Sequence, residues 1–183
     1  MIIAVTGNIG SGKTAVCRIF EKNGFSYINA DSVGHELYKR EDIKKQVIEI
    51  FGTKILTDDE IDRRKLKNIV FYDAEKLKIL NNIMHPEIIK EIKAKSTDNT
   101  VIEGALIIES GFEDYDNLIL ILIDKQTQYE RLKGKYNKDE INNILKSQLP
   151  QERMEKHADF IIENSDDKEE LEINVNNILR ELE

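Results

Sequence analysis

The sequence predicts an α/β fold in which a five-stranded parallel sheet carries helices on both faces. Short apolar runs alternate with segments whose apolar residues recur at helical spacing, and this strand–helix unit occurs five times. The run 118–123 is almost wholly apolar, which is typical of a strand covered on both faces. A glycine-rich turn joins the first strand to the first helix. Alternating units of this kind place their strands parallel in one sheet.

Two strand–helix units open the chain. Ile2–Val5 is expected to be a short buried strand, and the helix after it is expected to end at Asn23-Gly24. Phe25–Ile28 is expected to be the second strand, and it leads through Asn29-Ala30 to Asp31. Asp31 therefore lies at the carboxyl end of a strand, the edge at which open α/β sheets bind their ligands. An equally good interpretation of Asp31 is a helix N-cap, a position that favours aspartate.

Residues 32–95 are expected to form a helical insertion between the second and third strands. Apolar residues recur at helical spacing through it, and Thr57–Glu60 is a polar turn. Pro86 is expected to begin a new helix, because proline suits the first helical turn. The insertion is too long for a simple crossover. We therefore expect a substrate-binding subdomain within a single domain that covers residues 1–183.

Three further strands complete the predicted sheet: Thr100–Glu103, Leu118–Ile123 and Asp159–Glu163. A turn is expected at 164–167. The last helix follows it, and its apolar positions recur at helical spacing at Leu171, Val175, Ile178, Leu179 and Leu182.

A short lid is expected between the fourth and fifth strands, at about residues 131–150. A helix over 125–135 leads into a basic, glycine-containing break at 133–138. The helix after the break is expected to end at Pro150.

The turn after the first strand, Gly7-Asn8-Ile9-Gly10-Ser11-Gly12-Lys13-Thr14, fits the phosphate-binding pattern G-x-x-x-x-G-K-[ST]. Glycines let the backbone fold around an anion so that N–H groups point inward, and the following helix adds the positive end of its dipole. Lys13 can reach the outer phosphates, and the Thr14 hydroxyl can bind a magnesium ion shared with them. A chance glycine-rich turn is the alternative, but strand, loop and helix occur in the right order. The expected ligand is a nucleoside triphosphate.

Composition bounds the class of protein and its partners. Of 183 residues, 40% are hydrophobic and 34% are charged, which suits one domain with a solvated surface. The formal net charge of −8 disfavours nucleic acid as a partner, since that needs a basic face, but leaves room for a local basic pocket. With no long apolar run and a single cysteine, Cys17, we expect a cytoplasmic protein without a membrane partner. The three histidines lack metal-ligand spacing.

Four other residues each have two interpretations. Glu103 ends an apolar strand, where it either orients magnesium or is a plain carboxylate facing solvent. Arg131 either neutralises charge on a triphosphate as the lid closes or lies on a solvated helix face, and we favour the first. Arg63 either meets an anionic acceptor or is a surface charge. His85, directly before Pro86, either has a role in the site or only caps or packs.

The combined pattern resembles the dephospho-coenzyme A kinase family, and the resemblance runs over nearly the whole chain. The phosphate loop is shared with many unrelated proteins, whereas the segments that end at Pro86 and at Asn164 are much more specific. The residues that carry the resemblance are Thr6–Thr14, Asn29-Ala30-Asp31, Asp62–Leu66 with Val70-Phe71, Leu80–Pro86, Leu106–Glu109, Gln128 with Arg131, Gln148, and Ala158–Asn164.

The resemblance implies a P-loop kinase fold and transfer of the ATP γ-phosphoryl group to the ribose 3′-hydroxyl of dephospho-coenzyme A, the last step of coenzyme A synthesis. It implies that Asp31 accepts the hydroxyl proton and helps to arrange the metal, with Lys13 and the lid residue Arg131 as further catalytic groups. Thr14 and Glu103 would serve Mg²⁺. The residues that fall where the family holds the acceptor are Asp31, Arg63, His85, Leu106 and Glu109.

The chain departs from the family pattern at four positions. Asn29 stands where a first aspartate is usual, but Asp31 is retained. Ala105 replaces a proline and Ile107 a leucine in the acceptor segment. Lys135 replaces a second lid arginine, which keeps the charge but loses the planar fork that grips a phosphate in two places.

Two alternatives stay open from the sequence. One is another small-molecule kinase of the same fold, such as a kinase of nucleoside monophosphates. The other is a nucleotide-binding regulator that has lost catalysis. In the favoured interpretation the ligands are ATP, Mg²⁺ and dephospho-coenzyme A, and the protein is a monomer or a weak homo-oligomer.

Overall fold

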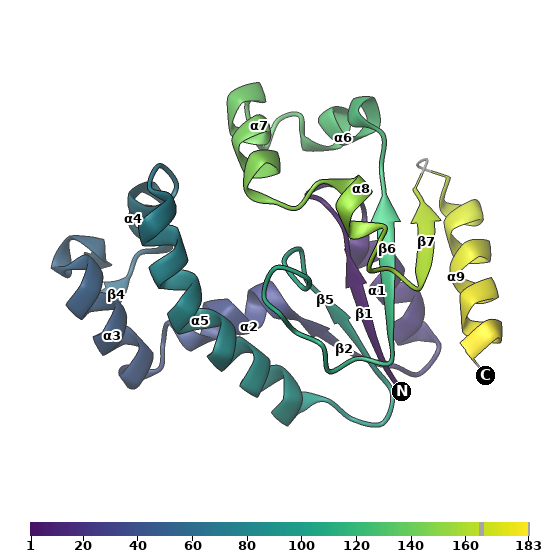
Figure 1. Cartoon of the computed structure of the whole chain (residues 1–183), viewed down its shortest axis with the longest axis horizontal. Helices are drawn as coiled ribbons and strands as arrows, with labels where there is room; N and C mark the ends of the chain where they lie inside the picture. Colours follow the sequence, from purple (N-terminus) through teal and green to yellow (C-terminus); the bar gives the residue numbers. More distant parts are fainter. Residues whose placement is uncertain (165–166, 183) are drawn as a thin grey trace. The chain divides into compact units, whose positions relative to one another are not determined.

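The structure is a computed structural model that describes residues 1–164 and 167–182. Its main sheet is parallel, with the order β2-β5-β1-β6-β7 (Figure 1). This confirms the predicted five-stranded parallel sheet flanked by helices. Part of the predicted turn at 164–167 lies outside the described residues. The strands are β1 (Ile2–Thr6), β2 (Ser26–Asn29), β5 (Thr100–Glu103), β6 (Asn117–Leu122) and β7 (Phe160–Glu163).

Both faces of the sheet are covered, as the burial of successive residues along its central strands shows. Ile3, Ala4 and Val5 of β1 are all fully buried, which a strand open on one side would not allow. On one face, the apolar sides of α1 (Lys13–Lys22) and α9 (Lys168–Leu182) join the strands in one core. Cys17 lies in this core, and burial raises the pKa of its thiol well above its ordinary value. Cys17 therefore packs within this core.

Contacts divide the chain into two compact units, Met1–Asn29 with Ser96–Glu183, and Ala30–Lys95. We call them unit 1 and unit 2. Unit 1 contains the sheet, together with helices between its last two strands. These helices are α6 (Lys125–Leu132), α7 (Lys138–Ser147) and α8 (Gln151–Met154).

Unit 2 has its own apolar core, formed by helices that the sequence periodicity predicted. Gly34 lets two of its helices approach closely, since a Cβ there would lie 3.1 Å from Ile88. A two-stranded hairpin completes the unit. Its elements are α2 (Ala30–Leu37), α3 (Glu41–Phe51), the 3₁₀ turn η1 (Thr53–Ile55), β3 (Leu56–Thr57), β4 (Glu60–Ile61), α4 (Arg63–Val70) and α5 (Ala74–Lys95).

The helix start predicted at Pro86 was wrong, and the helix predicted over 125–135 ends at Leu132. Pro86 does not begin a helix but lies inside α5, which continues from Ala74 to Lys95. A proline within a helix costs about 3 kcal/mol because one backbone hydrogen bond is lost. Leu80 and Met84 before the proline and Ile92 after it are all buried, and this burial on both sides offsets the cost.

The β3–β4 hairpin, the 3₁₀ turn η1 and the helix α8 were missed by the sequence analysis. The polar turn at Thr57–Glu60 joins the strands of the β3–β4 hairpin, with positive φ at Asp58 and Asp59. The four-residue helix α8 follows Pro150. Among the described residues, no helix is both long enough and apolar enough to cross a membrane.

Candidate active site

The loop between β1 and α1 is shaped by glycines that other residues could not replace. Gly7, Gly10 and Gly12 have φ values of 146°, 80° and 96°, in the region that favours glycine. A Cβ on Gly7 would lie 2.5 Å from the Ile121 carbonyl oxygen, and one on Gly12 would lie 2.1 Å from Asn164 Nδ2. The backbone therefore passes too close to its neighbours for any side chain.

The carbonyl groups of the loop are held by side chains from elements far along the chain. Gln128 Nε2 donates to the Ile9 carbonyl at 2.7 Å. The Arg131 guanidinium donates to the carbonyls of Gly10 and Ser11 at 3.0 and 3.2 Å. Buried Asn164 donates to the Ser11 carbonyl at 2.7 Å, and its Oδ1 accepts from Arg131 at 2.9 Å.

These bonds orient the N–H groups of the loop. In a trans peptide the C=O of one residue and the N–H of the next point in opposite directions. With the Ile9 and Ser11 carbonyls turned toward Gln128 and Asn164, the N–H groups of Gly10 and Gly12 point away from those side chains. N–H groups that face away from the side chains holding the loop, next to the start of α1, suit the binding of an anion.

Lys13 and Thr14 carry the functional groups of the motif. The Lys13 ammonium is almost buried and donates to the carbonyls of Gly7 and Asn8, at 2.8 and 3.1 Å. Thr14 Oγ1 donates to Glu103 Oε1 at 2.8 Å. Glu103 reaches the loop because β5 pairs with β1 in a register that places it beside Val5. The structure thus brings Thr14 and Glu103 into contact beside the loop that holds Lys13.

Glu103 has a second partner that the sequence analysis missed. The Tyr27 hydroxyl donates to Glu103 Oε2, and Asn29 Nδ2 donates to the Tyr27 oxygen at 3.3 Å. Burial and then the bond to Glu103 raise the pKa of Tyr27 to about 12. The signal available in the sequence was the two-residue spacing, which puts Tyr27 on the same face of β2 as Asn29.

The loop also fits a phosphorylated ligand because of a buried hydroxyl. No hydrogen-bond partner for Ser11 Oγ lies among the described residues, although Ser11 is fully buried. A Cβ on Gly7 would be 2.8 Å from this oxygen, so the hydroxyl lies across the loop from Gly7. A buried polar group without a partner costs about 1–3 kcal/mol. An anion bound in the loop would supply the missing acceptor.

The predicted acceptor segment in unit 1 follows β5. Leu106 is half-buried and lies in a run of turns, in which its carbonyl accepts from the Ser110 N–H at 2.8 Å. Glu109 is exposed, and its Oε1 accepts from the Leu149 N–H at 2.8 Å. The structure therefore gives Glu109 a contact with the segment after α7.

The other predicted site residues belong to unit 2. Asp31 is exposed in the first turn of α2, Arg63 is the first residue of α4, and half-buried His85 lies within α5. Asp31 and Arg63 both act on His35: partial burial and then the Arg63 charge lower the pKa of His35, while Asp31 opposes the change. These residues of α2 and α4 therefore lie near one another.

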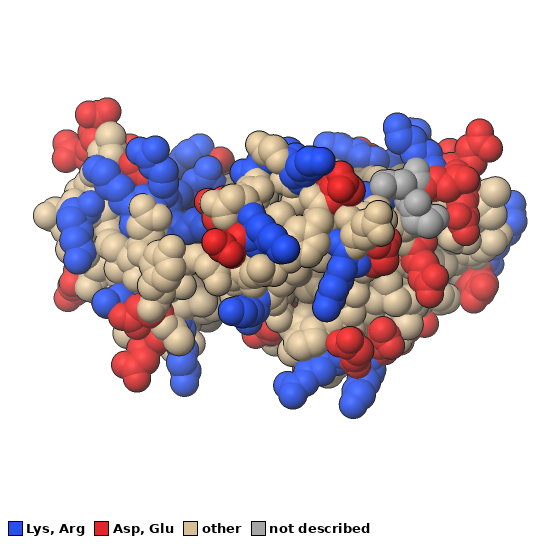
Figure 2. Space-filling view, turned by 90° about the horizontal axis from the view of Figure 1, so that it is seen from above, with Lys and Arg blue, Asp and Glu red and all other residues tan. Residues whose placement is uncertain are grey.

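Unit 2 also carries a local concentration of positive charge. Figure 2 shows Lys and Arg side chains gathered at the left of the view, where α4 lies. Asp62 begins this helix by accepting from the N–H groups of Arg64 and Lys65. This basic helix lies in a chain whose formal net charge is −8. Its basic residues are Arg63, Arg64, Lys65 and Lys67.

The fold and the loop define the class of protein. A parallel sheet whose first strand leads through a glycine cradle into a helix that begins with Lys13 and Thr14 is that of a P-loop kinase. The family description "Dephospho-CoA kinase" matches residues 1–170. The chain belongs to the dephospho-CoA kinase family and is a phosphotransferase.

Relatives and solved structures that are similar to this chain include two dephospho-CoA kinases. A dephospho-CoA kinase from Fusobacterium nucleatum is 38% identical over 179 residues, which cover 93% of each chain. The crystal structure of TT1252 from Thermus thermophilus is 27% identical, with a TM-score of 0.83 over 100% of this chain and 98% of that one. The dephospho-CoA kinase from Campylobacter jejuni is 26% identical, with a TM-score of 0.62 over 99% of this chain and 96% of that one.

Proposed function

We propose that this chain transfers the γ-phosphoryl group of ATP to the ribose 3′-hydroxyl of dephospho-coenzyme A. The observation that carries the proposal is the family match over residues 1–170. The glycine cradle supports it, because it retains Lys13 and Thr14 beside the buried Glu103.

In the proposed reaction the 3′-hydroxyl oxygen forms a bond to the γ-phosphorus. The bond from that phosphorus to the oxygen shared with the β-phosphate breaks, and ADP leaves. The hydroxyl proton passes to the Asp31 carboxylate, which suits the task because phosphoryl transfer needs positioning more than a strong base. The Lys13 ammonium, held beside the loop by two carbonyl groups, supplies positive charge at the outer phosphates.

The proposed metal is Mg²⁺, with Thr14 Oγ1 as its ligand and Glu103 beside it. Two oxygen groups 2.8 Å apart suit a hard cation. Magnesium is commonly held by one or two protein groups, with phosphate oxygens and water as its other ligands. When bound, it neutralises charge that develops on the phosphates.

The remaining roles are also proposals. Residues 32–95 would bind the acceptor, with Arg63 and His85 among its contacts. Residues 131–150 would act as a lid. Support for a role of Arg131 comes from its position, since its guanidinium already bonds to the carbonyls of Gly10 and Ser11.

A coupled assay with a panel of acceptors tests the proposal. ATP and Mg²⁺ are held constant while ADP release is followed with dephospho-coenzyme A, the nucleoside monophosphates and shikimate. Turnover with dephospho-coenzyme A at least about 100-fold above the other acceptors is expected. Preference for a nucleoside monophosphate would assign the chain to the other small-molecule kinases, and no turnover with any acceptor would favour the regulator.

Asp31→Asn tests the assignment of the proton acceptor. The amide keeps the size of the carboxylate but cannot take the proton at neutral pH, so we expect kcat to fall at least about 100-fold. The affinity for ATP should stay within about twofold of the wild-type value, because the change leaves the loop intact. Titration calorimetry with ATP measures it. Unchanged turnover would reject Asp31 as the proton acceptor.

A further inference from the structure

The segment Gln148-Leu149, which follows α7, lies between the phosphate loop and the turn that carries Glu109. We call it the return segment. Toward the loop, Gln148 Oε1 accepts from the Ile9 N–H at 3.0 Å, and the Leu149 carbonyl accepts from Asn8 Nδ2 at 3.2 Å. Toward the turn, the Leu149 N–H donates to Glu109 Oε1 at 2.8 Å. Two loop residues and one carboxylate are thus bonded to the same two residues.

Burial shields from water the hydrogen bonds that join the return segment to the loop. Gln148 is 8% exposed and Asn8 is 6% exposed, so water competes little for their bonds. Gln128, which is 4% exposed, donates to the Ile9 carbonyl at 2.7 Å. Both polar groups of Ile9 are therefore bonded to glutamines.

The proline after the return segment restricts it further. A residue that precedes proline is confined largely to extended backbone, so Leu149 has little freedom to turn its carbonyl independently of its N–H. The backbone of Pro150 is itself extended. Whatever fixes the Leu149 N–H therefore also limits the direction of the Leu149 carbonyl, which accepts from the Asn8 side chain. In this segment the group that fixes the N–H is Glu109.

We propose that Glu109 is a positioning residue for the phosphate loop, which it acts on through the return segment. The inference rests on the proposed function in one respect, namely that nucleotide phosphates bind in the loop. It differs from the role that the family resemblance implies for Glu109, which is contact with the acceptor. Only the positioning role predicts weaker nucleotide binding by a Glu109 variant when no acceptor is present.

Glu109→Ala and Glu109→Gln separate the two roles. Calorimetric titration with ADP and Mg²⁺, without acceptor, gives the nucleotide affinity. Glu109→Ala should weaken ADP binding by about threefold to tenfold, because a hydrogen bond that positions the loop is lost. Glu109→Gln should restore binding to within about twofold, since its amide oxygen can still accept from the Leu149 N–H.

A matched control is Glu113→Ala, which removes an exposed carboxylate from the same connection between β5 and β6. It should leave ADP affinity unchanged, and a loss equal to that of Glu109→Ala would overturn the inference by assigning the effect to net charge. Unchanged ADP affinity in Glu109→Ala, with a raised KM for dephospho-coenzyme A, would also overturn it. A wild-type chain that does not bind ADP would reject the proposed function itself.

A double-mutant cycle gives a second measurement. Asn8→Ala removes the bond at the other end of the path, from Asn8 to Leu149. If Glu109 acts through that bond, the double variant should bind ADP about as weakly as the weaker single variant. Losses that multiply would mean independent action and would overturn the inference. Thermal midpoints of all variants establish that each one folds.

Discussion

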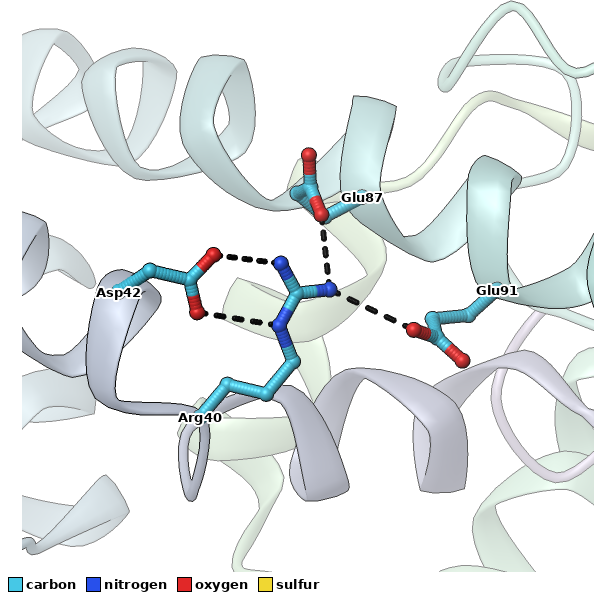
Figure 3. Close-up of polar contacts among 4 residues, drawn as sticks. All are labelled: Arg40, Asp42, Glu87 and Glu91. Atoms are coloured by element: carbon cyan, nitrogen blue, oxygen red, sulfur yellow. Dashed lines mark hydrogen bonds and ion pairs between the residues drawn. The ribbon is translucent and has the colours of Figure 1, made fainter.

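Polar side chains have different hydrogen-bond partners in the two compact units. In unit 1, Gln128, Arg131 and Asn164 bond to backbone carbonyls of the phosphate loop. In unit 2, Arg40 is bonded to other charged side chains. Figure 3 shows it between Asp42, on the next helix, and two glutamates of α5, Glu87 and Glu91.

The difference lies in burial and in the kind of partner. Asn164 is 6% exposed, and the group that accepts its hydrogen bond is the backbone carbonyl of Ser11. The side chains of Arg40 and Asp42 are 33% and 57% exposed, so water and salt screen their attraction. Backbone-directed bonds therefore set the shape of the loop, whereas the Arg40 cluster adds little beyond holding two helices together.

The largest expected effect comes from adding a side chain at Gly12, where the loop lies against Asn164. Gly12→Ala puts a Cβ 2.1 Å from Asn164 Nδ2, at a φ of 96° that alanine rarely adopts. Because the Asn164 side chain must shift and lose its place beside the strained loop, kcat/KM for ATP should fall at least about 100-fold. Steady-state kinetics with saturating acceptor measures this.

A glycine outside the loop, Gly24, provides a matched control for this substitution. Gly24→Ala also lies at a positive φ, of 92°, but no heavy atom lies within 4 Å of its Cβ position among the described residues. It shares the backbone strain of Gly12→Ala without the collision. Equal losses in the two variants would mean that strain alone matters, and that Asn164 does not define the loop.

The sequence analysis identified the loop but not what holds it. The motif predicted Gly7, Lys13 and Thr14 because their spacing reflects local chemistry within eight residues. Gln148 and Asn164 were recognised only through the family resemblance, without roles, since their bonds to Ile9 and Ser11 span 139 and 153 residues. Such contacts follow from strand order and register, which no local pattern reports.

For other parts of the fold, the type of element could be predicted from the sequence, but not always its boundaries. Alternating apolar segments predicted the five parallel strands, since burial on both faces shapes each strand locally. Pro86 misled the analysis because its local preference for a helix start was outweighed by packing along all of α5. The roles proposed for Asp31, Arg63 and His85 stay predictions.

An intermediate effect is expected when one backbone-directed bond is removed. Asn164→Ala leaves the Ser11 carbonyl with the weaker bond from Arg131 and takes one partner from the guanidinium. We expect KM for ATP to rise about tenfold, with kcat changed less, because the loop loses order before the reacting groups do. Steady-state kinetics measures both constants. Asn177→Ala, at an exposed position of α9, is the control, and a similar rise there would contradict the comparison.

The smallest effect is expected for the charged cluster of unit 2. Arg40→Met keeps much of the aliphatic stem but removes the charge, so we expect unchanged kcat and a fall in thermal midpoint of about 2 °C or less. Raising the salt concentration from about 0.05 to 0.5 M should reduce the difference between variant and wild type, because the wild-type pairs are screened. Differential scanning fluorimetry measures both.

The pH dependence of this cluster has a definite sign. Arg40 holds the pKa of Asp42 at about 2, below its ordinary value of 3.8, so the carboxylate binds a proton less readily in the folded chain. The stabilising contribution is therefore fully present above about pH 4 and is lost as pH falls from there toward 2. Between pH 5 and 8 the midpoint difference between Arg40→Met and wild type should stay constant. A large midpoint loss, or a changed KM for either substrate, would mean that the cluster shapes the site as the loop bonds of unit 1 do.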